Sequence, residues 1–259
     1  MSPRPSLTSL VAALRLLVVG LHLLSGLLQV ALLFRFVDGV RRRLLRQVWS
    51  RQLLFLLGVH LEPARLNAAG PVRALDGLIV SNHVSFLDIF VINALAPAAF
   101  VCKEDVARWP LIGWLCRGSE TVFLARGNRS AAYRAHRQIV ARLRAGERMV
   151  VFPEGTTSTG DRVLPFHGAL FQSAIDAGVP VVCLALSYHD RRGWPTEAAA
   201  YTGDLSLLRC LWQIAAAGGL RAYLQVLPPL TGLAGRRHLA QHAQLRISQA
   251  LTRQRLLPG

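Results

Sequence analysis

The sequence predicts an α/β protein: a central mixed sheet layered with helices, preceded by an N-terminal apolar helical membrane anchor. From residue 63 onward, short apolar runs alternate with stretches of helical length, the pattern of a sheet covered by helices. Residues 16–34 are mostly apolar and carry no charged side chain. The chain has 259 residues, of which 52% are hydrophobic and 17% charged. It can therefore bury one large core, and this composition excludes a disordered chain.

The apolar runs predict the elements in chain order. Short runs that are often β-branched predict strands at residues 77–80, 99–102, 121–124, 148–152, 179–186 and 220–227. Helical length and spacing predict helices at 86–95, 130–145, 167–177, 205–217 and 238–251. The periodicity is interrupted at 190–200, and we expect the segments after this point to complete the same sheet.

The N-terminal apolar run has the length of a membrane segment. Residues 16–34 carry no charged side chain and measure about 28 Å as a helix, at about 1.5 Å per residue. Arginines crowd its C-terminal side, which the positive-inside bias places in the cytoplasm. A second apolar stretch, 53–61, is too short to cross. The pair predicts an anchor lying in one leaflet, and the alternative is a helix hairpin packed on a soluble core.

The charge is strongly positive. Thirty Lys and Arg residues against 14 Asp and Glu residues give a formal net charge of +16, and Lys103 is the only lysine. This balance predicts an anionic partner such as a membrane surface or a phosphorylated substrate. Nucleic acid is not favoured, because the arginines cluster beside the apolar segments and aromatic residues make up only 7%. The four cysteines form no Cys-x-x-Cys pair, and we expect no metal and no cofactor.

The sequence Ser-Asn-His-Val-Ser-Phe-Leu-Asp at residues 81–88 follows a predicted strand and opens a predicted helix. Ligands bind at this end of the strands in open α/β sheets. His83 and Asp88 can meet if His83 lies in the turn and Asp88 inside the helix. A carboxylate that holds one imidazole nitrogen leaves the other free to accept a proton near neutral pH. The alternative is a helix cap in which Ser85 and Asp88 form a capping box.

Two further strand ends carry polar residues. Val-Phe-Pro-Glu-Gly-Thr at residues 151–156 ends a strand in a turn where Gly155 permits close backbone approach and Glu154 supplies a carboxylate. Phe-Leu-Ala-Arg at residues 123–126 ends in an arginine suited to a phosphate or carboxylate. No Walker loop, no Gly-x-Gly-x-x-Gly and no Gly-x-Ser-x-Gly motif occurs, so these nucleotide-binding and serine-nucleophile motifs are excluded.

Taken in order, these segments resemble the 1-acylglycerol-3-phosphate acyltransferase (PlsC-type) family of lysolipid acyltransferases. The resemblance covers about residues 76–190 and ends with Val179 and Pro180. It implies transfer of a fatty acyl group from an acyl thioester, on coenzyme A or acyl carrier protein, to the free hydroxyl of a lysolipid. It implies that His83 is the general base and that Asp88 orients it. The acceptor site would comprise Lys103, Arg126, Glu154, Gly155 and Thr156.

The chain departs from the family pattern at two positions. Glu120 stands where the family usually has Gly, and Thr157 stands where many members have Arg. A carboxylate near the acceptor phosphate would repel it, so Glu120 must point away or the acceptor must differ. 1-Acylglycerol-3-phosphate is the first expectation for the acceptor, and lyso-ornithine lipid is the alternative. In the latter case Glu120 could pair with the ornithine amine.

The predicted organisation is a membrane-associating helical segment at residues 1–62 and an acyltransferase domain at residues 63–259. We expect the protein at the inner (cytoplasmic) membrane, with the catalytic domain facing the cytoplasm. A hypothesis of another class remains: a non-catalytic basic protein that binds membranes. Thioester cleavage that depends on added lysolipid separates the two.

Overall fold

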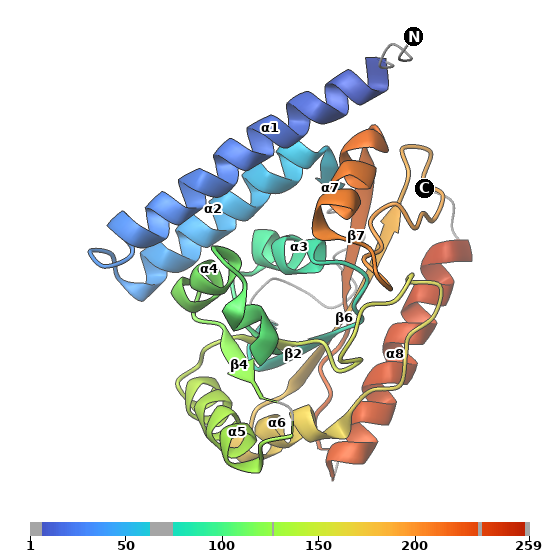
Figure 1. Cartoon of the computed structure of the whole chain (residues 1–259). Helices are drawn as coiled ribbons and strands as arrows, with labels where there is room; N and C mark the ends of the chain where they lie inside the picture. The colour runs from blue at the N-terminus through green and yellow to red at the C-terminus, as the bar shows by residue number, and fades with distance from the viewer. Residues whose placement is uncertain (1–6, 63–74, 126, 233–234, 257–259) are drawn as a thin grey trace.

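The computed structural model describes residues 7–62, 75–125, 127–232 and 235–256 (Figure 1). Within these ranges the strands are β1 (Val59–Leu61), β2 (Leu78–Ser81), β3 (Ala99–Lys103), β4 (Val122–Leu124), β5 (Met149–Val151), β6 (Val181–His189) and β7 (Leu220–Val226). The α-helices are α1 (Leu7–Leu28), α2 (Gly39–Leu57), α3 (Leu87–Leu95), α4 (Ile112–Gly118), α5 (Arg129–Arg144), α6 (Gln172–Ala177), α7 (Leu207–Ala216) and α8 (Arg236–Leu256).

The strands form one mixed sheet in the order β1-β7-β6-β2-β5-β3-β4. Every neighbouring pair is parallel except β6 and β7, which are antiparallel. The predicted fold class is thereby confirmed. The structure adds β1 at one edge, a strand that the sequence analysis did not predict. It also extends β6 to His189, because this strand continues pairing with β7 beyond the end of β2.

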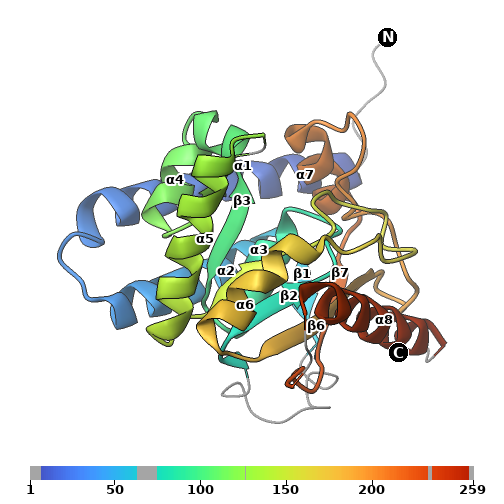
Figure 2. The same cartoon turned by 90° about the horizontal axis from the view of Figure 1, so that it is seen from below.

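Two layers of helices cover the sheet, and strand side chains alternate between them (Figures 1 and 2). Ile79 and Val150 point to the face covered by α2, α3 and α7. Leu78 and Met149 point to the face covered by α5, α6 and α8. The strands are apolar on both sides for this reason, as expected for a sheet buried between two layers.

The N-terminal segment is a helix hairpin. Its second helix, α2, belongs to the first of these layers, and its first helix, α1, packs on the outside of that layer. α1 lies beside α2 and α7, and the Arg15 guanidinium donates to the Ala215 carbonyl at the end of α7, at 3.0 Å. His22 stacks on Trp49, with ring centroids 4.7 Å apart, and joins α1 to α2. Residues 9–33 are apolar and long enough to cross a membrane, with a mean hydropathy of 2.2 and 11% of the most apolar window buried.

The second apolar stretch behaves differently from the prediction. Leu53, Leu54 and Leu57 on α2 are buried in the core over the sheet. The chain then runs into β1, which pairs with β7. The expectation that residues 53–61 lie in the membrane is therefore wrong, and the alternative of a hairpin packed on the core describes α2. The remaining exposed apolar surface of the hairpin lies mainly on α1.

Candidate active site

The structure brings His83 and Asp88 together at the carboxyl end of β2. His83 lies in the turn that follows the strand, and Asp88 lies in the first turn of α3. The His83 Nδ1 atom is 2.8 Å from the Asp88 Oδ2 atom. A carboxylate can only accept here, so Nδ1 carries the proton and Nε2 presents a lone pair. Among the described residues Nε2 has no hydrogen-bond partner, which leaves it available to a substrate hydroxyl.

Asp88 is fully buried and also holds the turn that precedes α3. Its Oδ2 atom accepts from the backbone amides of Val84, at 2.8 Å, and Ser85, at 3.1 Å. Its Oδ1 atom accepts from the Tyr188 hydroxyl at 2.7 Å. The pair with His83 is therefore formed, whereas the capping box is incomplete: Asp88 accepts from the Ser85 amide, but the buried Ser85 hydroxyl has no hydrogen-bond partner among the described residues.

Two interactions hold the His83 ring and the turn around it. The imidazole stacks on Phe152, with ring centroids 3.9 Å apart and an interplanar angle of 9°. The Asn82 amide exchanges two 2.9 Å hydrogen bonds with the Leu186 backbone, which fixes the turn to β6. The His83 side chain is 19% exposed, so one edge of the ring faces solvent.

Glu154 organises the backbone next to His83. Its carboxylate accepts from the His83 amide at 2.7 Å and from the Leu164 amide at 2.9 Å. Burial raises the pKa of Glu154 to about 7, although the two amide hydrogen bonds oppose the shift. The carboxylate is thus directed at the protein backbone, where it joins the turn that holds His83 to the backbone at Leu164. Gly155 follows in a left-handed conformation with φ +68°.

Two of the remaining predicted substrate residues, Lys103 and Thr156, lie after or at the carboxyl ends of strands in this part of the sheet. Lys103 is exposed at the carboxyl end of β3, two strands from β2 in the sheet order. Thr156 is exposed in the loop after Glu154. The hydroxyl of Thr157 donates to the Tyr201 carbonyl. Arg126 lies outside the described residues.

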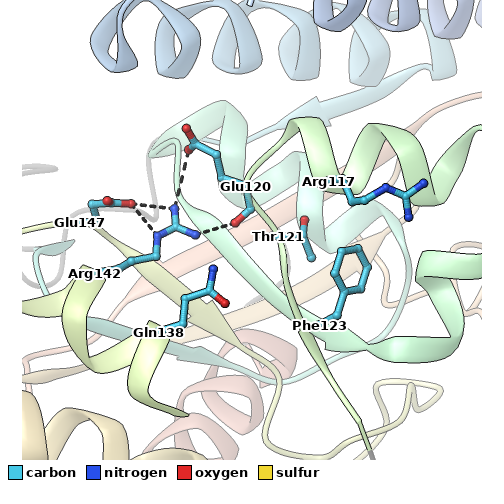
Figure 3. A pocket seen from close by; sticks show the side chains of 7 residues that line it. All are labelled: Arg117, Glu120, Thr121, Phe123, Gln138, Arg142 and Glu147. Carbon is cyan, nitrogen blue, oxygen red and sulfur yellow. Dashed lines mark hydrogen bonds and ion pairs between the residues drawn. The ribbon is translucent and has the colours of Figure 1, made fainter. Parts of the chain in front are cut away.

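Glu120 lies at the opposite end of the strands, where the parallel strands begin. It precedes β4, whereas His83 follows β2, and the intervening strands are parallel. Its carboxylate is 3.3 Å from the Arg46 guanidinium and 3.7 Å from that of Arg142. It borders a cavity of about 580 Å³ shown in Figure 3, lined by Arg117, Glu120, Thr121, Phe123, Gln138, Arg142 and Glu147. The expectation that Glu120 could pair with an acceptor amine is therefore wrong.

Tyr188 is the residue of this site that sequence reasoning missed. It lies 100 residues from Asp88 in the sequence, beyond the predicted end of its strand. An overhang of β6 past β2 brings it to α3. No sequence motif signals such a contact, because it depends on the strand order of the sheet.

Comparisons with known proteins identify the family of this chain and its fold. An acyltransferase family model matches residues 68–187. The lyso-ornithine lipid O-acyltransferase of Pseudomonas aeruginosa is 36% identical over 249 residues, which cover 93% of this chain and 95% of the relative. The 1-acyl-sn-glycerol-3-phosphate acyltransferase of Neisseria meningitidis serogroup B is 39% identical over 165 residues, covering 64% of this chain and 63% of the relative.

A crystal structure shares the fold. The 1-acyl-sn-glycerophosphate acyltransferase PlsC from Thermotoga maritima superposes with a TM-score of 0.64 at 20% sequence identity, covering 96% of this chain and 99% of that one. The structure defines a mixed α/β protein with a histidine–carboxylate pair after a central strand of the sheet. Within that class, this chain belongs to the acyltransferase family.

Proposed function

We propose that this protein transfers a fatty acyl group from an acyl thioester to the free hydroxyl of a lysolipid. The observation that carries the proposal is the 2.8 Å contact between His83 and Asp88, with Nε2 free. Nε2 takes the proton of the acceptor hydroxyl as its oxygen attacks the thioester carbonyl. The C–S bond then breaks, and the leaving thiolate receives that proton from the imidazolium. Asp88 stabilises the imidazolium and keeps its ring in place.

The acceptor headgroup lies, in this proposal, beside Lys103 and Arg126. Both are cationic; Lys103 is the last residue of β3, and Arg126 follows two residues after Leu124 in the sequence. Gly155 and Thr156 supply the loop that closes the site, and Glu154 holds that loop to His83. A charge-assisted hydrogen bond from each cation would select a phosphate or carboxylate group.

The first candidate acceptor is 1-acylglycerol-3-phosphate, which gives phosphatidic acid. The relative from Neisseria meningitidis carries this activity in its name. The second candidate is a lyso-ornithine lipid. Two observations favour it: the Pseudomonas aeruginosa relative aligns over nearly its whole length, and Thr157 supplies no cation next to the site.

We further propose that the N-terminal segment, residues 1–62, binds the cytoplasmic membrane from the cytoplasmic side through α1, whose outward face lies in one leaflet. The packing of α1 along α2 and α7 supports this orientation over one in which α1 projects from the body. The outward leucines of α1 and the arginines near the hairpin turn suit acyl chains and anionic headgroups respectively.

An acyl-transfer assay tests the proposal. Purified protein in vesicles receives acyl-CoA or acyl carrier protein as donor, together with lysophosphatidic acid or lyso-ornithine lipid, and the products are identified by mass spectrometry. Lysolipid-dependent release of the thiol and one acylated product are expected. Failure of every donor and acceptor pair would favour the non-catalytic membrane protein.

Thr157→Arg tests the acceptor. Added positive charge should lower the KM for lysophosphatidic acid or leave it unchanged, and should raise the KM for lyso-ornithine lipid if that is the acceptor. Thr157→Val is the matched control, because it removes the hydrogen bond to Tyr201 without adding charge.

A further inference from the structure

The second oxygen of the Asp88 carboxylate has one described partner. Three donors converge on Oδ2, whereas Oδ1 accepts only the Tyr188 hydroxyl, at 2.7 Å. Asp88 has no exposed surface and Tyr188 is 3% exposed, so water does not replace this contact. The hydroxyl therefore completes the hydrogen bonding of a buried carboxylate, which would otherwise leave a charged oxygen unpaired.

The sheet places Tyr188 at this position. Ser81, the last residue of β2, pairs with Leu184 of β6, and β6 continues for five residues beyond that pair. Leu184, Leu186 and Tyr188 alternate onto the face that α3 covers. The hydrogen bonds of Asn82 with Leu186 fix the turn to β6 two residues before Tyr188.

We infer that Tyr188 is a positioning residue for the acyltransferase reaction, acting through Asp88 to set the orientation and basicity of the His83 imidazole. The hydroxyl locks the carboxylate rotamer, so that Oδ2 points at Nδ1 and Nε2 points outward. It also draws charge toward Oδ1 and away from the imidazole. This inference rests on the proposed function.

The titratable groups around this contact are few in the described part of the chain. His83 lies in the turn before α3, and Glu154 reaches it from the loop after β5. Cys210 of α7 lies close enough to Tyr188 to act on it electrostatically. Burial, together with the negative charge of Asp88, raises the pKa of Tyr188 well above its usual range. The phenol is therefore a neutral donor throughout the working pH range.

Tyr188→Phe removes the hydroxyl and keeps the ring. We expect kcat to fall by about 10- to 100-fold, the size of one hydrogen bond to a charged group, with KM unchanged. The carboxylate would then present more negative charge to the imidazole, which stabilises its protonated form. The acid limb of the kcat/KM profile should therefore move to higher pH.

Tyr223→Phe is the matched control. Tyr223 is a buried tyrosine on β7, paired with Ser187, and it contacts the His189 ring. Its substitution also removes a buried hydroxyl, so its melting temperature measures the cost of that loss alone. We expect its kcat and its pH profile to match those of the unsubstituted protein.

If Tyr188→Phe does not fold, a second variant with a smaller change tests the same inference. Incorporation of 3-fluorotyrosine at position 188 makes the hydroxyl a stronger donor and should move the acid limb to lower pH. The downfield proton resonance of His83 Nδ1–H gives a readout that needs no turnover, and it should shift in both variants. Loss of all acyl transfer by the unsubstituted protein would defeat the proposed function while leaving this resonance to test Tyr188. An unchanged kcat, acid limb and resonance in Tyr188→Phe would overturn the inference.

Discussion

Single residues at the start of α3 serve structure and chemistry together. Asp88 accepts the Val84 and Ser85 amides of the turn that precedes α3, and the same oxygen holds His83. The spacing of His83 and Asp88 predicted their contact because it requires only a strand, a turn and a helix. It could not predict Tyr188, whose approach depends on how far β6 extends beyond β2.

His83→Ala should reduce acyl transfer by about 10² to 10⁴-fold, the usual cost of removing a general base. Folding should persist, because the imidazole is partly exposed and the buried Asp88 retains its two amide donors and Tyr188. Steady-state rates with the preferred lysolipid, alongside circular dichroism, measure the two effects. Turnover close to that of the unsubstituted protein would contradict the proposed mechanism.

Glu154→Gln should alter how stability depends on pH. The folded protein raises the pKa of Glu154 from 4.5 to about 7, so it binds this proton more tightly than the unfolded chain does. The contribution is fully present below pH 4.5 and is lost as the pH rises to about 7. The variant should therefore show a smaller fall in unfolding free energy across this window. Urea unfolding at several pH values measures it.

Asp204→Asn controls for a general loss of negative charge, because Asp204 is exposed in the loop before α7. Its stability profile should run parallel to that of the unsubstituted protein. A Glu154→Gln profile that also runs parallel would show that Glu154 does not titrate in this window.

At the scale of elements, local pattern predicted most of the sheet. The strands from β2 to β7 lie at or within a few residues of the apolar runs, because short β-branched runs bounded by turns suit a buried strand. The role of α2 could not be predicted, because Leu53, Leu54 and Leu57 have the same composition whether they face lipid or core. The short β1 strand has no pattern of its own and is defined by pairing with β7.

The ion pair that joins α2 to the segment before β4 gives a prediction at this scale. Glu120 adopts φ +62°, a conformation that favours glycine, and it pairs with Arg46, whose side chain is 8% exposed. Glu120→Gly should relieve about 1 kcal/mol of backbone strain. It also removes the carboxylate from a buried guanidinium, a loss that outweighs the relieved strain but stays below the cost of about 3–5 kcal/mol for a fully buried pair, because Glu120 is 35% exposed and Arg46 keeps its hydrogen bond to the Ser119 carbonyl. We expect a net loss of stability, measured by urea unfolding.

The matched variant Glu120→Ala keeps a side chain at this position and should be less stable still, because the strain remains. Neither variant should change the preference between lysophosphatidic acid and lyso-ornithine lipid, since Glu120 lies at the end of the strands away from His83. A selective loss of one acceptor would show that the cavity in Figure 3 belongs to the substrate site.

At the scale of the whole molecule, the two helical layers differ in what they present outward. The layer that contains α2, α3 and α7 is covered by α1, and α1 carries an exposed stripe of apolar side chains comprising Leu14, Leu17, Leu21, Leu24 and Leu28. The opposite layer contains α5 and α8, whose exposed positions are rich in arginine. The two sides of the molecule therefore differ: one exposes apolar side chains on α1 and the other exposes arginines.

Truncation is a poor test of this arrangement, because removing residues 1–49 would strip most of α2 from α3 and expose the core. The double variant Leu17→Glu with Leu21→Glu acts on the outward stripe alone, where both side chains are more than 60% exposed. Each buried leucine contributes about 1.5–3 kcal/mol to membrane binding, against about 1 kcal/mol for an arginine near anionic lipid. The double variant should therefore bind vesicles much more weakly, whereas high salt should only loosen the unsubstituted protein.

Leu245→Glu on α8, on the opposite layer, should leave vesicle sedimentation unchanged. Complete release of the unsubstituted protein by salt alone would show that arginine contacts, and not α1, hold it to the membrane.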